Sequence, residues 1–89
     1  RAIMDKRSKL LKKLNLAYVS RDGSFKDIMK DVVAFNKKHP YVSITQDTIS
    51  KSIYTRTNIS ARMQNGVTIS PKLKAEIDAH VRNYWGGSN

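Results

Sequence analysis

Apolar residues in this chain recur at intervals of three or four positions, and this spacing is the feature that most limits the fold. The clearest case lies at 24–38, where the stripe consists of Phe25, Ile28, Met29, Val32 and Val33. Such spacing places side chains on one face of a helix, whereas a strand alternates them. A turn signal at Asp22-Gly23 precedes the stripe, and Pro40 prevents its continuation. The pattern therefore predicts a helix over 24–38.

The same spacing predicts helices in the rest of the chain. Near the N-terminus, Leu10, Leu11 and Leu14 indicate a short basic amphipathic helix, docked by these leucines and followed by less regular structure from Leu16 to Val19. Thr45 can cap a helix over 45–53, and Thr55 can cap another over 55–64 that ends at Gly66 in the left-handed conformation. Ser70-Pro71 is a start signal for the last helix. The residues expected in the core of these segments are Ile49, Ile53, Ile59, Met63, Leu73 and Ile77.

The resulting fold class is all-α, a four- to five-helix bundle. The short run 41–44 favours β structure, but one run of this length is expected to be a linker whose Val42 and Ile44 touch the core. We divide the chain into a basic N-terminal helix or extension at 1–20, a main domain at 21–85 and a flexible tail at 86–89.

The chain carries a large excess of positive charge. Its 89 residues include 17 Lys and Arg against 7 Asp and Glu, so the net charge is +10. Such a protein attracts polyanions, and nucleic acid is the leading partner. No apolar run approaches the roughly 18 residues that a membrane span needs. We therefore expect a soluble, cytoplasmic protein that does not enter membranes.

The residues do not favour catalysis or metal binding. The chain has no cysteine, and its histidines, His39 and His80, are isolated from other potential ligands. Asp27 and Asp31 lie one helical turn apart beside lysines, as surface residues commonly do. Glycine-rich phosphate loops are missing from the sequence. We expect no enzyme activity, no cofactor, no metal and no small-molecule ligand.

The segments 45–53 and 55–64 carry a resemblance to a known family. A supporting helix followed closely by a polar one is the arrangement of a helix-turn-helix, whose second helix enters the major groove of DNA. The run from Ile44 to Ser50 resembles the opening of this motif in lambda-repressor and Cro-like regulators. The run from Arg56 to Ser60, with Met63 and Asn65-Gly66, is similar to their recognition helix. The resemblance covers roughly 24–84 and implies sequence-specific binding of double-stranded DNA.

The chain departs from this family at three places. The expected turn at 53–55 has no glycine and is one residue shorter, the segment 59–66 is one residue longer, and the join at 38–44 is also longer. A second register therefore stays open. In it, 44–51 resembles the recognition helix of lac-repressor-like proteins, and Ile69-Ser70-Pro71 resembles a short motif that follows it. We favour 55–64 as the recognition helix over 45–54, because it has more outward polar groups.

The favoured register assigns roles to side chains. Arg56 can make bidentate contacts to guanine and Asn58 to adenine, while Thr57 can meet a phosphate or a thymine methyl group. Gln46 and Asn65 lie at helix ends where phosphates can bind. The remaining candidate contacts, chiefly to the DNA backbone, are Lys51, Thr55, Ser60, Arg62, Lys6, Arg7 and Lys9.

The resemblance implies a bacterial or phage transcription regulator, acting as a repressor by occupancy and binding as a homodimer. Two alternatives remain. One is a DNA-binding module of a replication initiator, recombinase or nuclease. The other is a basic protein that binds RNA or a membrane surface through its N-terminal helix.

Overall fold

The computed structural model describes residues 2–21, 23–66 and 71–85, and within these ranges the chain is helical with no strand. The helices are α1 (Ala2–Ser20), α2 (Ser24–Lys38), α3 (Gln46–Asn65) and α4 (Pro71–Tyr84), with a short 3-10 helix, η1 (Pro40–Val42), between α2 and α3. The predicted all-α class is confirmed. The predicted helix over 24–38 is also confirmed, and the expected tail at 86–89 lies outside the described residues.

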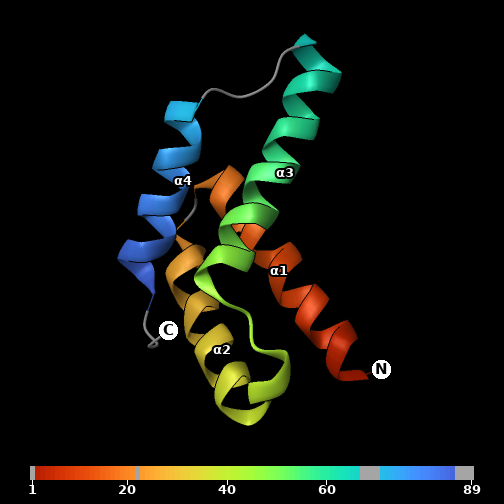
Figure 1. The fold of residues 1–89 in the computed structure, drawn as a ribbon, viewed down its shortest axis with the longest axis vertical. Coiled ribbons are helices and arrows are strands. Elements are labelled where there is room, and N and C mark those ends of the chain that lie inside the picture. Colours follow the sequence, from red (N-terminus) through yellow and green to blue (C-terminus); the bar gives the residue numbers. More distant parts are fainter. Residues whose placement is uncertain (1, 22, 67–70, 86–89) are drawn as a thin grey trace.

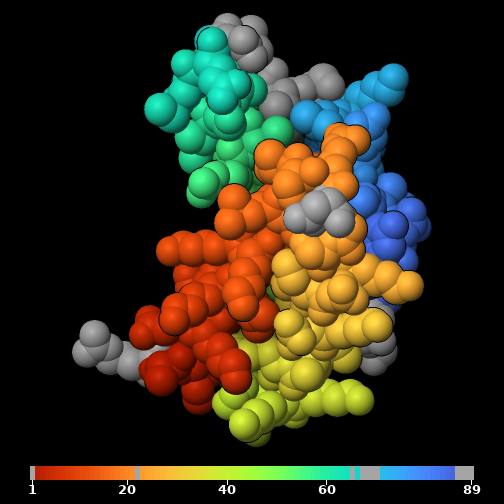
Figure 2. Space-filling view, turned by 180° about the vertical axis from the view of Figure 1, so that it is seen from behind, coloured from red at the N-terminus to blue at the C-terminus, as the bar shows by residue number. Residues whose placement is uncertain are grey.

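One hydrophobic core joins all four helices. Helix α1 packs against α2 and α3, and α4 packs against α3 and α2 (Figures 1 and 2). The buried side chains of the core are Leu10, Leu14, Ala17, Phe25, Met29, Val32, Phe35, Ile44, Ile49, Ile53, Ile77 and Val81. The predicted docking of the N-terminal helix through its leucines is confirmed, since Leu10 and Leu14 are buried and Leu11 packs against the core. Helix α1 is thus part of the same core as the rest of the chain.

Local signals set the helix ends where the sequence placed them. The Thr45 hydroxyl accepts a hydrogen bond from the Thr48 amide at 3.1 Å and so caps α3. Gly66 ends α3 with a φ of 68°, a left-handed conformation that glycine adopts without strain. Pro71 is the first residue of α4, while Ser70, its expected cap, lies outside the described residues.

The predicted break between 45–53 and 55–64 is wrong, because α3 continues through both segments. Ile53-Tyr54-Thr55 contains neither glycine nor proline, so the helical hydrogen bonds are not interrupted there. Thr55 is therefore an interior helical residue and not a cap. The segments are two halves of one helix, with no turn between them. The expectation of less regular structure from Leu16 to Val19 is also wrong, because α1 extends to Ser20.

Helix α3 is longer than the core that it covers. Its first half buries Ile49 and Ile53, as predicted. Its second half runs past the core; the first half of α4 lies beside it in Figure 1, and residues of α1 face it across a pocket. Ile59 is consequently 50% exposed and Met63 83% exposed, so their predicted place in the core is wrong. The second half of α3 presents most of its surface to solvent.

Polar side chains from α1 and α2 hold the start of α3 in place. The Arg7 guanidinium donates hydrogen bonds to the carbonyl oxygens of Val42 at 2.9 Å and Ser43 at 3.3 Å. The Asn36 amide donates to the carbonyl of Ile44 at 2.8 Å, and its oxygen accepts from the Ile44 amide at 2.7 Å. These bonds fix the connector immediately before Thr45, so the direction of α3 depends on them.

Aromatic rings close the end of the core that is formed by α1, α2 and α4. The His80 ring lies 5.0 Å from the Tyr18 ring and 4.8 Å from the Phe25 ring, measured between centroids. Burial among these rings lowers the pKa of His80 below its usual 6.5, and the charge of Arg21 lowers it further. Burial likewise raises the pKa of Tyr18.

The lowered pKa of His80 predicts that the folded protein becomes less stable in mild acid. Between the lowered pKa of folded His80 and the 6.5 of the unfolded chain, only the unfolded chain binds the proton. The free energy of unfolding is therefore expected to decrease as the pH falls through 6.5. Urea unfolding between pH 8 and pH 5 should show a smaller decrease for His80→Gln, with His39 common to both proteins. Identical pH profiles would show that His80 titrates alike in both states.

Candidate nucleic-acid interface

Helix α3 turns a polar and basic surface toward solvent. We define the α3 outward face as Asp47, Thr48, Lys51, Ser52, Thr55, Arg56, Ile59 and Arg62. The first seven residues line one shallow open depression, and Arg62 follows Ile59 by three positions, so it continues the same side of the helix. The face thus includes residues from both segments that the two sequence registers proposed for DNA recognition.

The charge on this face is positive along nearly its whole length. Asp47 is the one acidic residue of α3, and it pairs with Lys51 at 3.2 Å while both side chains stay 75% exposed. So exposed an ion pair contributes little to stability, and Lys51 can readily exchange Asp47 for another anionic partner. Arg56 and Arg62 are exposed and form no ion pair within the described residues. Their guanidinium groups are available to an anionic ligand.

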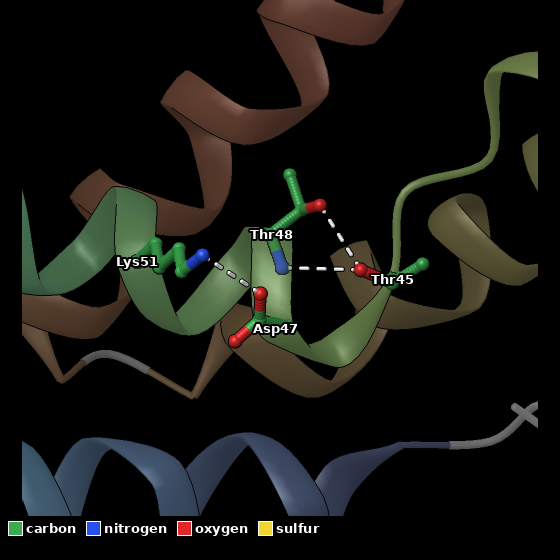
Figure 3. A network of polar contacts seen from close by, with 4 residues as sticks. All are labelled: Thr45, Asp47, Thr48 and Lys51. Carbon is green, nitrogen blue, oxygen red and sulfur yellow. Dashed lines mark hydrogen bonds and ion pairs between the residues drawn. The ribbon is translucent and has the colours of Figure 1, made fainter.

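The N-terminus of α3 is less suited to a phosphate than the sequence suggested. Figure 3 shows that the Thr45 hydroxyl accepts a hydrogen bond from the Thr48 amide, and that the Asp47 carboxylate lies in the same first turn. Gln46, expected beside a phosphate, is half-buried here. The negative charge of Asp47 already interacts favourably with the helix dipole and repels a second anion. The outward face beyond Asp47 is the better anion site.

The structure does not bring all the predicted contact residues together. Thr57 is half-buried, and its buried hydroxyl has no hydrogen-bond partner within the described part of the chain. Asn58 is also half-buried, in contrast to the exposed Lys51 and Arg62 on its side of the helix. Ser60 is exposed on the side of α3 that faces α1. The side chain of Asn65 lies outside the described residues. Lys51, Thr55, Arg56 and Arg62 are the predicted contacts that share one face.

Helix α1 carries a second basic surface. Lys6, Lys9 and Lys13 line a shallow depression between α1 and α2, together with Lys38 from the end of α2. We call these four residues the α1–α2 basic surface. One carboxylate, that of Asp31, lines the same depression. Sequence reasoning had placed Lys13 with Lys6 and Lys9 in one basic N-terminal segment but missed Lys38, because its place beside them depends on how α2 packs against α1.

Arg7 does not belong to this basic surface. Its guanidinium is occupied, in a partly buried position, by the carbonyl oxygens of Val42 and Ser43. Its role in the fold is to hold the connector to α3. The sequence could not reveal this role, because the partners lie more than thirty positions away in the chain.

We predict that replacing Arg7 lowers the free energy of unfolding more than replacing Lys9 does. Arg7→Gln should lower the free energy of unfolding by about 0.5–1.5 kcal/mol, because it removes two hydrogen bonds to backbone carbonyls. Lys9→Gln changes an exposed side chain and should stay within about 0.5 kcal/mol of the parent. Urea unfolding of both variants measures the difference. Equal stabilities would mean that Arg7 is free to contact a ligand.

Within residues 2–21, 23–66 and 71–85, no three His, Asp or Glu side chains come together as metal ligands would. No helix in these ranges has the length and apolar character to cross a membrane. Comparison of the chain with protein-family models, with curated proteins and with solved structures found no match.

Proposed function

We propose that this protein binds double-stranded DNA through the α3 outward face. The observation that carries the proposal is a rigid helix of 20 residues whose exposed side has hydroxyl groups and cations and no acidic residue after Asp47. Hydroxyl and guanidinium groups are the donors that proteins use toward base edges and phosphates. The net charge of +10 supplies long-range attraction to the same ligand.

The shape of the molecule supports the same proposal. The major groove of B-DNA is about 12 Å wide and accepts one α-helix. Helix α3 is roughly 30 Å long at 1.5 Å per residue, and its second half extends beyond the core (Figure 1). Arg56, Thr55 and Ile59 lie on this accessible part, so a duplex can approach them without moving another helix. Asp47 lies at the other end of the face, where a phosphate is less favourable.

The α1–α2 basic surface is proposed to contact the DNA backbone. Its lysines sit on α1 and at the end of α2, outside the proposed base-reading face, so their charge acts on phosphates without adding sequence preference. This assigns Lys6, Lys9 and Lys13 the auxiliary role that the sequence suggested for the N-terminal segment.

The biological role that fits best is a small transcription regulator of a bacterium or phage, acting in the cytoplasm as a repressor by occupancy. This role rests on the sequence resemblance of 44–66 to helix-turn-helix regulators, although the segment forms one continuous helix in place of the two helices of that motif. A homodimer would raise the affinity for DNA. A DNA-binding module of a larger replication or recombination protein would use the same face. Binding of DNA is common to these roles.

One competition experiment tests the ligand class. Labelled random-sequence duplex DNA bound to the full chain is displaced, at one salt concentration, by unlabelled duplex DNA, single-stranded RNA or anionic phospholipid vesicles. The proposal expects duplex DNA to compete best at equal phosphate concentration. Stronger displacement by RNA or by vesicles would contradict it. Selection of bound sequences from a random duplex pool then identifies the preferred site.

A further inference from the structure

A groove separates α1 from the second half of α3. The two helices meet where the Asn15 amide and the Ser52 hydroxyl hydrogen-bond at 3.1 Å, and they diverge beyond this contact. The resulting α1–α3 groove has a volume of about 520 Å³ and is lined on one side by Lys12, Leu16 and Val19 and on the other by Arg56, Thr57 and Ala61. Figure 2 shows the hollow between the red-orange α1 and the green-to-teal part of α3.

The α1 side of this groove exposes large apolar side chains. Leu16 is 65% exposed and Val19 is 64% exposed, although they lie one helical turn apart on a helix that otherwise buries its leucines. Opposite them, α3 contributes the small side chain of Ala61 and leaves space between the helices. Burial of adjacent apolar side chains by a partner is favourable, because it removes them from water.

The rim of the groove is positively charged. Lys12 and Arg56 face it from the two helices, and no carboxylate is among its lining residues within the described chain. The Thr57 hydroxyl in its wall has no hydrogen-bond partner among the described residues. An occupant that complements this surface needs apolar side chains in the middle and negative charge at the edges.

We infer that the α1–α3 groove binds an acidic amphipathic helical segment of a partner protein. From Arg56 to Gln64 the α3 wall spans roughly 12 Å, the length of about two helical turns. A helix of that length can place leucine-like residues against Leu16 and Val19 and carboxylates beside Lys12 and Arg56, in the manner of helices that bind hydrophobic grooves. Charge complementarity selects this occupant.

Other occupants fit the groove less well. A second copy of this chain also carries a net charge of +10 and would bring like charges together across the contact. The phosphate backbone of DNA pairs with Lys12 and Arg56 but does not pack against leucine and valine. An acidic helix satisfies both the charge and the apolar surface.

The groove shares Arg56 with the α3 outward face, which gives the partner a regulatory effect. A bound acidic segment would neutralise Arg56 and lower the affinity for DNA. This consequence rests on the proposed function, whereas peptide binding itself does not require it. The two ideas are therefore separable in experiment.

Selection from a random peptide library tests the inference. A displayed library of random 16-residue peptides is selected on the immobilised full chain, and the best peptides are then synthesised. We expect them to carry Asp or Glu around apolar residues spaced three and four apart, and to bind more weakly as salt is raised. Selected peptides without acidic residues, or no enrichment at all, would overturn the inference.

Variants then locate the binding site. The double change Leu16→Ser and Val19→Ser should weaken peptide binding by about tenfold or more, because both side chains are removed from the contact. Tyr41→Ser, at an apolar position that is 98% exposed on η1, is the matched control and should bind normally. Circular dichroism verifies that each variant is folded. Equal binding by the double variant and the parent would reject the groove as the site.

A last arm separates this inference from the proposed function. The selected peptide should displace duplex DNA from the parent protein but not from a preformed complex of the Leu16/Val19 double variant, which keeps Arg56. If the parent binds no DNA yet binds the peptide in the groove, the proposed function fails and this inference stands. Peptide that binds the double variant as tightly as the parent would reject the inference whatever happens to DNA.

Discussion

Replacing Ile77 by alanine is expected to lower the free energy of unfolding by about 2–5 kcal/mol, whereas Ile59→Ala should change it by less than about 0.5 kcal/mol. Ile77 is fully buried in the core, where truncation removes apolar contacts and leaves a cavity. Ile59 is 50% exposed on the second half of α3, and alanine favours the helix more than isoleucine does. Urea unfolding of the two variants under the same conditions measures both values.

These variants form a matched pair, because both replace isoleucine by alanine inside a helix. A large effect for both would place a core under the second half of α3, and the account of that half as an exposed recognition surface would be wrong. No effect for either would place Ile77 outside the core. The expected result is a clear difference between the two.

The second large effect is expected in DNA binding. Arg56→Ala should weaken binding to the sequence selected from a random duplex pool by about 1–3 kcal/mol, with relaxed preference at one base position. The reason is that Arg56 lies exposed in the middle of the α3 outward face, without an ion-pair partner in the described residues, and a guanidinium can bind guanine through two hydrogen bonds.

Lys51→Ala provides the comparison on the same face. A lysine that contacts phosphate should weaken binding to selected and random duplexes by similar factors, since phosphates carry no sequence. Filter binding or fluorescence anisotropy measures the affinity of the parent and of each variant for both duplexes. If Arg56→Ala also reduces both affinities equally, Arg56 contacts the backbone and another residue reads the bases.

Much of the fold follows from local sequence signals. Thr45, Gly66 and Pro71 each act within one turn of a helix, through a cap, a left-handed residue and a fixed φ. Because these effects involve near neighbours in the chain, the sequence was sufficient to predict them. Core positions with helical spacing, such as Ile49 and Ile77, were predicted for a related reason.

Other features depend on long-range geometry that the sequence does not contain. Spacing placed Ile59 and Met63 on one helical face, but it could not tell whether another helix covers that face. The expected break before Thr55 came from the interpretation of Thr55 as a helix cap, while the residues there have no helix-breaking element. Arg7 looked like a free cation because its carbonyl partners belong to a distant connector.

The candidate interface was therefore predicted in part. Lys51, Thr55, Arg56 and Arg62 share one exposed face, because α3 is continuous and their spacing suits a single helix. Thr57 turns away from that face for the same reason, while Asn58 lies on the side of Lys51 and Arg62 but is half-buried. In one continuous helix, the direction of each side chain follows from its position in the sequence. A turn at 54 would have let the residues before and after it point in unrelated directions.

The central claim is that DNA binds to the α3 outward face and not to positive charge in general. The most direct measurement compares the slope of log affinity against log salt for two triple variants on one random duplex. Each replaces three exposed cations by glutamine and so reduces the net charge from +10 to +7. The first variant changes the cations of the outward face, namely Lys51, Arg56 and Arg62. The control changes cations on α2 and at the end of α4, namely Lys26, Lys30 and Arg82.

The account predicts that the outward-face variant loses about 2–3 units of slope, because each phosphate contact contributes nearly one. The control variant should keep the slope of the parent, since its charges lie away from the duplex and only change the general attraction. Unfolding curves of both variants verify that the fold is retained. An equal loss in the two variants, or a loss in the control alone, would contradict the claim that the α3 outward face is the DNA-binding surface.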